Sequence, residues 1–241
     1  MTTLVLGASG ATGRKLVEQL LLKSQKVKII VRAPDRLPEA WLRNKNVIII
    51  QASISELSVT EMAVHLSDCQ AVTSCLGHRP DLKGIYGKPR KLVTEAIELV
   101  CLAIRQNAAS LPTRVVLMNT AGNRNKDLNE PFSLGEKLIT ALLRVLVPPH
   151  TDNEQAAEYL RQIIGQQDPH VAWVVVRPDS LIDEDEVTSY EVYGSPIRSP
   201  LFNAGITSRI NVGNFMARLV TDADLWNEWK GQMPVLYNSE T

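Results

Sequence analysis

The chain has 241 residues, of which 44% are hydrophobic, and 26 basic side chains balance 26 acidic ones. Zero net charge disfavours a dedicated nucleic-acid-binding protein, because such proteins usually carry a basic excess. The length suits one sizeable core, so we expect a single domain over residues 1–241. No leader-like segment precedes the first apolar run and no apolar run is long enough to span a bilayer, so we expect a cytoplasmic protein without a membrane span.

Runs rich in apolar and β-branched residues alternate along the chain with helical patterns. The spacing predicts strands over Thr3–Leu6, Val27–Val31, Val47–Gln51, Ala71–Cys75, Arg114–Met118 and Ala172–Val176. It predicts helices over Ala11–Lys23, Glu39–Arg43, Val59–Leu66, Arg90–Asn107 and Glu154–Gln166. Such alternation is typical of βαβ units, and it predicts an α/β fold with a doubly wound parallel sheet.

The regular alternation stops after Pro178. Val187–Tyr193 alternates like a strand, Val212–Val220 has a helical pattern, and Met233–Tyr237 fits a last short strand. We expect this C-terminal part to form a small cap on the substrate side of the domain.

The first predicted strand leads into a glycine-rich turn, and the turn leads into a helix. Glycines at these positions permit a tight turn, let the backbone approach a phosphate group and allow the helix to pack closely on the strand. The free amides and the positive end of the helix would then face a pyrophosphate. We predict a dinucleotide-binding loop formed by Gly7, Ser9, Gly10, Ala11, Thr12 and Gly13.

The end of the second predicted strand carries the candidate residues for the adenosine half of the dinucleotide. Arg32 stands where an acidic residue would select NAD, and a guanidinium there suits the 2′-phosphate of NADP. Arg36 is a second candidate contact, whereas Asp35 is interpreted as a turn residue. Ser53 and Ile54, past the third strand, would lie near the adenine. The predicted cofactor is therefore NADP(H).

Ligands of such sheets bind beyond the carboxyl ends of the strands. The residues after the fourth, fifth and sixth strands are therefore expected at the nicotinamide end. These are Leu76, Gly77, Arg79, Asn119, Thr120 and Pro178.

The spacing Gly-x-x-Gly-x-x-Gly resembles the atypical short-chain dehydrogenase/reductase group, which includes NmrA-like and NAD(P)H-binding domains. Further matching stretches make the chain similar to the flavin reductase/biliverdin-IX-beta reductase branch: Val31-Arg32, Leu76 to Leu82, Asn119 to Ala121, Val174 to Pro178, and Ser208-Arg209. The resemblance implies a Rossmann-type fold with NADPH extended across the sheet edge. It also implies an open acceptor pocket, with Thr120 in place of a family serine.

The Tyr-x-x-x-Lys pair, the usual proton donor of short-chain dehydrogenases, does not occur in this chain. Thr120 and His150 are the candidate catalytic residues, although His150, after two prolines, could simply begin a helix. Reduction of a simple carbonyl needs a proton donor at the oxygen. A flavin or quinone can take its proton from water, so the sequence favours hydride transfer to such a conjugated acceptor.

Two other features leave alternatives open. The segment Asn123 to Val147 is longer than in the resembling branch, and Leu138, Ile139, Leu142, Leu143 and Val147 are apolar at helical spacing. It could be a lid over the acceptor, an oligomer face, or an extra helix packed on the core. The three cysteines have no metal-ligand spacing, so we expect free thiols and no metal site.

These features together predict an NADPH-dependent oxidoreductase that acts on a small-molecule acceptor of the flavin or quinone type. We expect a monomer or homodimer that binds no nucleic acid. The alternative is a non-catalytic NADP(H)-sensing regulatory protein of the NmrA-like kind, or a scaffold built on the same fold.

Overall fold

The structure is a computed structural model that describes residues 1–78, 81, 86–131 and 133–239. Its main sheet contains β1 Thr2–Leu6, β2 Lys26–Val31, β3 Val47–Gln51, β4 Ala71–Ser74, β5 Thr113–Met118, β6 Val171–Pro178, β8 Tyr190–Tyr193 and β10 Val235–Asn238. A separate two-stranded sheet contains β7 Ser180–Ile182 and β9 Ile206–Ser208. The helices are α1 Ala11–Leu22, α2 Glu39–Leu42, α3 Val59–Leu66, α5 Leu92–Asn107, α6 Leu134–Leu146, α7 Pro148–Glu158, α8 Arg209–Thr221 and α9 Ala223–Trp229.

The strands of the main sheet follow the order β3-β2-β1-β4-β5-β6-β10-β8. From β3 to β6 every neighbouring pair is parallel, and only β8, at the far edge, runs antiparallel to β10. The chain crosses from β3 over β1 to β4, so the order reverses beside β1, as it does at the ligand-binding edge of doubly wound sheets. The predicted doubly wound α/β fold is confirmed.

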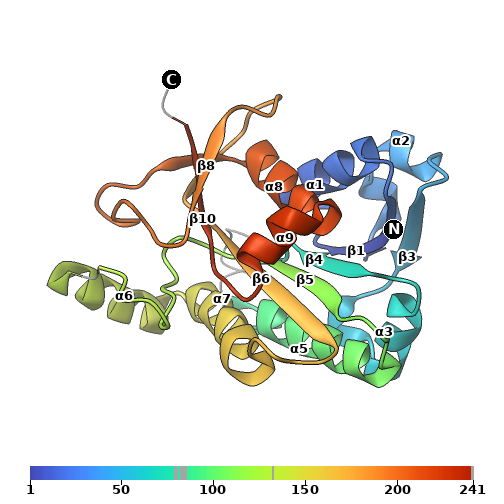
Figure 1. Ribbon diagram of the computed structural model, residues 1–241, viewed down its shortest axis with the longest axis horizontal. Coiled ribbons are helices and arrows are strands. Elements are labelled where there is room, and N and C mark those ends of the chain that lie inside the picture. Colours follow the sequence, from blue (N-terminus) through green and yellow to red (C-terminus); the bar gives the residue numbers. More distant parts are fainter. Residues whose placement is uncertain (79–80, 82–85, 132, 240–241) are drawn as a thin grey trace.

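Helices cover both faces of the sheet (Figure 1). Leu4 and Leu6 of β1 pack into a core with α3, α5 and α7, whereas Val5 packs on the other side with α1, α8 and α9. All three side chains are at most 1% exposed. Alternate side chains of a strand point to opposite faces, and a strand covered on both faces must be apolar throughout. This explains the continuous apolar runs of the sequence.

Helix α1 is held in place by α8. A Cβ at Gly213 of α8 would lie 2.8 Å from the backbone nitrogen of Leu16 in α1, so only glycine permits this approach. The contact matters for the site, because the first turn of α1 follows the glycine-rich loop.

The C-terminal part differs most from the expectations. Helix α7 begins at Pro148 rather than Glu154, because proline is well tolerated in the first turn of a helix. The strand predicted over Val187–Tyr193 forms only over Tyr190–Tyr193, and β7, β9 and α9 were not predicted. Strands β7 to β10 form the expected cap, which lies at the top of Figure 1. Across the described ranges, no helix has the length and apolar character to cross a membrane.

Candidate functional site

The glycine-rich loop is fixed by contacts that leave no room for side chains. Gly7 has φ +77°, and a Cβ there would lie 2.6 Å from the carbonyl carbon of Cys75, just past β4. A Cβ at Gly13 would collide with the Gly7 carbonyl oxygen. The loop is therefore pressed between the end of β4 and the first turn of α1.

The first turn of α1 offers backbone donors to an anion. Gly10 is its N-cap and has no side chain to accept the amide hydrogens, and the turn carries no acidic residue. Ser9, Gly10 and Ala11 are exposed, whereas Thr12 and Gly13 are buried beneath them. A helix start with unsatisfied amides and a positive dipole end suits a phosphate group.

Arg14, which the sequence suggested as a further side-chain donor to the pyrophosphate, is a positioning residue in the structure. Its guanidinium donates to the backbone carbonyl of Ser9 at 3.3 Å and to that of Arg36 at 2.9 Å. These bonds tie the glycine loop to the turn that follows β2.

A groove of about 500 Å³ runs from the glycine loop across the ends of β2 and β4. Arg32 and Arg36 are exposed and line it together with Lys88, so its charge is mainly positive. Asp35 is exposed in a 3₁₀ turn, Pro34–Arg36, and does not line the groove. The remaining lining residues are Ser9, Ala33, Gly77, His78, Asp81, Pro89 and Leu92.

Several other predicted cofactor residues are not among these lining residues. Leu76 is half-buried just before Gly77, and Arg79 lies outside the described residues. Ser53 follows β3, where its hydroxyl lies 3.0 Å from that of Ser55. Ile54 lines a neighbouring cavity of about 190 Å³, which shares Leu92 with the groove.

The start of α7 connects the ends of β4 and β5. The carboxylate of Asp152 lies 2.7 Å from His78 Nε2, and it accepts hydrogen bonds from the backbone amides of Val93 and Thr94 at 2.8 and 2.9 Å. Both His78 and Asp152 are almost fully buried. The sequence reasoning missed this pair, for which the only signal was a histidine at the edge of the sheet and an acid near a helix start.

The predicted residues after β5 form one hydrogen-bonded turn. The Asn119 side chain accepts from the backbone amide of Thr120 at 2.9 Å and donates to the carbonyl of Asn153 in α7 at 2.8 Å. The Thr120 hydroxyl accepts from the backbone amide of Gly122 at 3.3 Å. The Pro178 carbonyl accepts from the next amide, that of Ala121, at 2.9 Å. The structure thus brings Asn119, Thr120 and Pro178 together.

A second pocket, of about 200 Å³, begins beside Thr120 and extends under α6. We call it the α6 pocket. Its lining residues are Ala121, Gly122, Arg124, Glu130, Pro131, Glu136, Thr140, Leu143, His150, Pro196, Ile197, Arg198, Ser199, Pro200 and Leu201. Of the two candidate catalytic residues, His150 lines this pocket, whereas Thr120 directly precedes the lining residues Ala121 and Gly122 without lining the pocket itself.

His150 is mostly buried in the first turn of α7. Its Nε2 atom is buried without a hydrogen-bond partner and lies 3.6 Å from the Glu154 carboxylate. Burial lowers the pKa of His150; Glu154 opposes that effect and Arg144 adds to it. His150 is consequently neutral near pH 7.

A buried ion pair supports the wall of the α6 pocket. Arg177 is fully buried and its Nη2 lies 2.7 Å from a carboxylate oxygen of Glu130. Arg177 also donates to the backbone carbonyls of Met233 at 2.6 Å and Asn123 at 2.9 Å, and Glu130 accepts from the Asn125 amide at 2.8 Å. These bonds hold residues 123–130 against the sheet.

Helix α6 forms the outer wall of the pocket and projects from the body of the protein (Figure 1). Its N-terminus has a capping box in which Ser133 and Glu136 bond reciprocally. Leu143 faces the pocket, whereas Leu138 and Leu142 are 75% and 56% exposed. The interpretation of this segment as a helix whose apolar side packs on the core is wrong.

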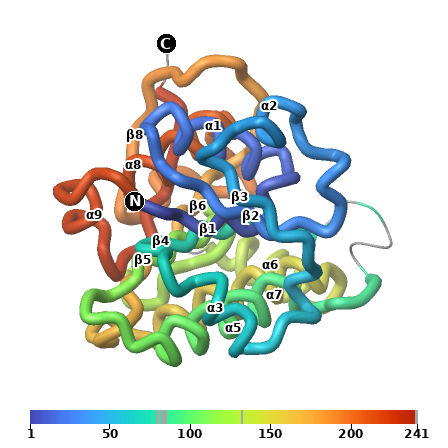
Figure 2. The backbone as a smooth tube through the Cα atoms, turned by 90° about the vertical axis from the view of Figure 1, so that its right-hand side faces the viewer, coloured from blue at the N-terminus to red at the C-terminus, as the bar shows by residue number. Residues whose placement is uncertain are grey.

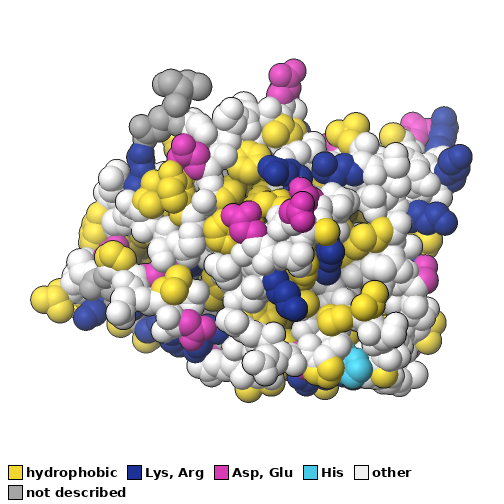
Figure 3. Space-filling view, viewed as in Figure 1, with side chains coloured by type: hydrophobic (Ala, Val, Ile, Leu, Met, Phe, Trp, Pro, Cys, Tyr) yellow, Lys and Arg dark blue, Asp and Glu magenta, His cyan; other side chains and the backbone are white. Residues whose placement is uncertain are grey.

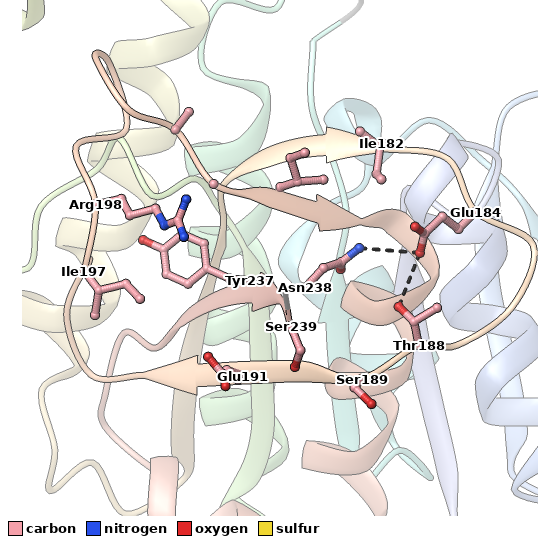
Figure 4. Close-up of a pocket in the computed structure, with 13 residues that line it drawn as sticks. Ile182, Glu184, Thr188, Ser189, Glu191, Ile197, Arg198, Tyr237, Asn238 and Ser239 are labelled. Carbon is pink, nitrogen blue, oxygen red and sulfur yellow. Dashed lines mark hydrogen bonds between the residues drawn. The ribbon is translucent and has the colours of Figure 1, made fainter. Parts of the chain in front are cut away.

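The largest cavity, about 980 Å³, lies in the cap between β7, β9 and β8. Figure 4 shows Tyr237, Arg198 and Ile197 at one end and the hydrogen bonds of Glu184 with Asn238 and Thr188 at the other. None of the predicted site residues lines this cavity, although it shares Ile197 and Arg198 with the α6 pocket. Size alone therefore does not identify the cofactor groove.

The cysteines have no partner that would make them reactive. Cys69, Cys75 and Cys101 are free thiols, and burial raises the pKa of each to about 12. A thiol with such a pKa is protonated and a poor nucleophile at neutral pH. In the part of the chain that the structure describes, no three His, Cys, Asp or Glu side chains gather as metal ligands.

Solved structures share this fold over nearly the whole chain. A wide-type short-chain dehydrogenase/reductase of Veillonella parvula in complex with NADP is 17% identical, with a TM-score of 0.70; the match covers 100% of this chain and 95% of that one. ChuY, an anaerobilin reductase of Escherichia coli O157:H7, is 16% identical with a TM-score of 0.69, covering 100% and 98%. A Streptococcus pneumoniae protein named for NADH-flavin reductase activity is 18% identical with a TM-score of 0.65, covering 99% and 100%.

Sequence identities this low show a common fold and no more. No curated protein matches the chain. A sequence model of one family does match, over residues 7–223. This range includes the glycine loop, the turns that follow β4 and β5, and most of the cap. The protein therefore belongs to the NAD(P)H-binding family.

Proposed function

We propose that this protein is an NADPH-dependent reductase that transfers hydride to a planar conjugated acceptor of the flavin or quinone type, bound in the α6 pocket. The observation that supports it most directly is the position of this pocket. Its lining includes Ala121 and Gly122, which directly follow Thr120 beyond the carboxyl end of β5, on the same sheet edge as the glycine loop. In doubly wound sheets ligands bind at this edge, so the cofactor and the acceptor would meet there.

The residues around the groove fit the cofactor. The tight backbone turn formed by Gly7 and Gly13 and the uncapped start of α1 suit the pyrophosphate, and Arg32, Arg36 and Lys88 provide positive charge for a 2′-phosphate. The positive lining favours NADP over NAD. When bound, the nicotinamide supplies the hydride.

The protein's own groups position the reactants and leave the proton to water. The Thr120 hydroxyl accepts from Gly122, so its own hydrogen is free to donate to the nicotinamide amide or to the acceptor. His150, neutral because its pKa is lowered, can relay a proton but adds no fixed charge. Arg124 and Arg198 line the pocket and favour an acceptor that carries carboxylate or phosphate groups.

Calorimetric titration with NADPH and NADH, followed by NADPH oxidation assays with flavin mononucleotide and a soluble quinone, tests this proposal. We expect NADPH to bind more tightly and to be oxidised only when an acceptor is present. Thr120→Val should lose the oxidation while Thr120→Ser, which retains the hydroxyl, should keep most of it. Tight NADPH binding without oxidation by any acceptor would contradict the reductase and support a cofactor-sensing protein.

A further inference from the structure

The outer surface of α6 is apolar, although it faces solvent. Its side chains are exposed by 82% at Leu134, 75% at Leu138, 56% at Leu142, 78% at Val145 and 50% at Leu146. Phe202, which is 62% exposed, lies against Gly135 and extends the same surface. We call these six residues the α6 apolar face.

The polar residues of α6 are turned the other way. Glu136 and Thr140 are 8% and 5% exposed and line the α6 pocket, so the helix places its polar side inward and its apolar side outward. The capping box through Ser133 and Glu136 keeps the helix formed up to its first residue. A continuous apolar surface of this kind on a stable helix marks an interaction site.

The charges that border the face are basic. Glu136 is the only acidic residue in α6, and it is buried, while Lys137 and Arg144 are exposed along one margin. Lys137 makes no ion pair with any described residue, whereas Arg144 binds Glu154 at 2.8 Å. Basic side chains stand beside hydrophobic ones along α6 at the left of Figure 3.

Aromatic and basic residues also lie near the C-terminal end of α6. The Tyr86 hydroxyl donates to the Leu146 carbonyl at 3.1 Å, and its ring is exposed. Arg90 and Lys91, both exposed, follow Tyr86 within a few residues. In Figure 2 residues 86–91, drawn in green, lie on the same side of the molecule as α6 and α7. Helices that lie in a lipid headgroup layer have this pattern: leucine and phenylalanine at the centre, and tyrosine and basic residues at the margin.

We infer that the α6 apolar face docks on the surface of a bilayer that contains anionic lipids. A second copy of the chain would bring the same basic margin to the interface and no acidic residue of α6 to complement it, because the two surfaces of a twofold interface are identical. Anionic headgroups complement Lys137, and the acyl region accommodates the leucines. The helix would lie in the membrane surface without crossing it.

Docking in this position has a consequence for the acceptor, and this step rests on the proposed function. Because Glu136, Thr140 and Leu143 of the same helix line the α6 pocket, the pocket would lie at the membrane surface. A lipophilic quinone dissolved in the bilayer could then enter it directly.

Co-sedimentation of the full chain with phosphatidylglycerol-rich vesicles and with pure phosphatidylcholine vesicles tests the docking without any assay of activity. We expect binding to the anionic vesicles, reduced about tenfold by Leu138→Gln with Val145→Gln, because each side chain loses apolar contact with lipid. Leu22→Gln with Leu111→Gln is the matched control, since both leucines are 77% exposed elsewhere on the surface. Lys137→Glu should also weaken binding, and Lys45→Glu should not.

Absence of binding to anionic vesicles, or binding equal in the α6 variant and in its control, would overturn the proposal. A wild-type dimer that the α6 double variant converts to monomer, measured by light scattering, would also overturn it and identify a second copy as the partner. Vesicle binding by a protein that oxidises no NADPH would contradict only the reductase, since the docking test does not depend on turnover. Oxidation of NADPH by a soluble quinone should be unchanged in the double variant.

Discussion

The cofactor groove and the α6 pocket lie beyond the ends of different strands, and they are stabilised by different kinds of contact. On the cofactor side, Gly7 and Gly13 press backbone against backbone, and the loop has no space for a side chain. At the α6 pocket, residues 123–130 are held by a buried ion pair, Arg177 with Glu130, and by the ion pair of Lys126 with Glu158 of α7. The geometry of the glycine loop is therefore fixed by backbone contacts, whereas that of the α6 pocket depends on paired side chains.

The largest effect should come from breaking the support of the acceptor side. Glu130→Ala would leave Arg177 charged, buried and unpaired, at a cost of roughly 3–5 kcal/mol in the free energy of unfolding. Chemical denaturation would measure this, and Glu18→Ala, at an exposed position, serves as the control. A loss below about 1 kcal/mol would mean that the ion pair contributes as little as a surface pair.

On the cofactor side, Gly13→Ala should act on binding and stability together. The new Cβ would collide with the Gly7 carbonyl, and overpacking of this kind costs about 1–3 kcal/mol. We expect calorimetry to show weaker binding of NADPH and NADH alike, because the pyrophosphate is common to both. Gly194→Ala, where a Cβ meets nothing within 4 Å, should change neither quantity. Normal cofactor affinity in Gly13→Ala would contradict the assignment of the loop.

Replacement of Arg32 should affect the binding of NADPH but not that of NADH. Arg32→Ser should weaken NADPH binding about tenfold and leave NADH nearly unchanged, because only the 2′-phosphate loses a charge-assisted bond. Arg43→Ser, an exposed arginine in the segment after α2, is the control. Equal losses for both cofactors would show that Arg32 does not read the 2′-phosphate.

The contrast between the backbone contacts of the glycine loop and the side-chain contacts of the α6 pocket also explains what could be predicted from the sequence. The glycine loop and the alternating strands were predictable because their signals are local: a spacing of three glycines, and apolar runs such as Val47–Gln51, which forms β3 with the same bounds. The strands β7 and β9 were missed because they have three residues each and little apolar pattern.

Tertiary partners were beyond the reach of sequence patterns. The spacing of Leu138 and Leu142 indicated an amphipathic helix but not which side of it meets the protein. The bond of Asp152 to His78 joins residues far apart in the chain, and no periodicity reports such a pair. The roles of Thr120 and His150 stay predictions until turnover is measured.

The smallest expected effect is that of His150 on the pH dependence of the melting temperature, Tm. Burial lowers its pKa in the folded state, so the unfolded chain, with a pKa near 6.5, takes up the proton first as the pH falls. The stability that the neutral imidazole permits is present above this value and is lost as the pH falls below it. In Tm measured from pH 8 to pH 5, His150→Gln should therefore decline less steeply than the wild type. His65, His78 and His170 are present in both proteins, so the difference between the two curves isolates His150. Parallel curves would mean that His150 stays solvated, and an imidazole in ordinary contact with water would have no special role at the α6 pocket.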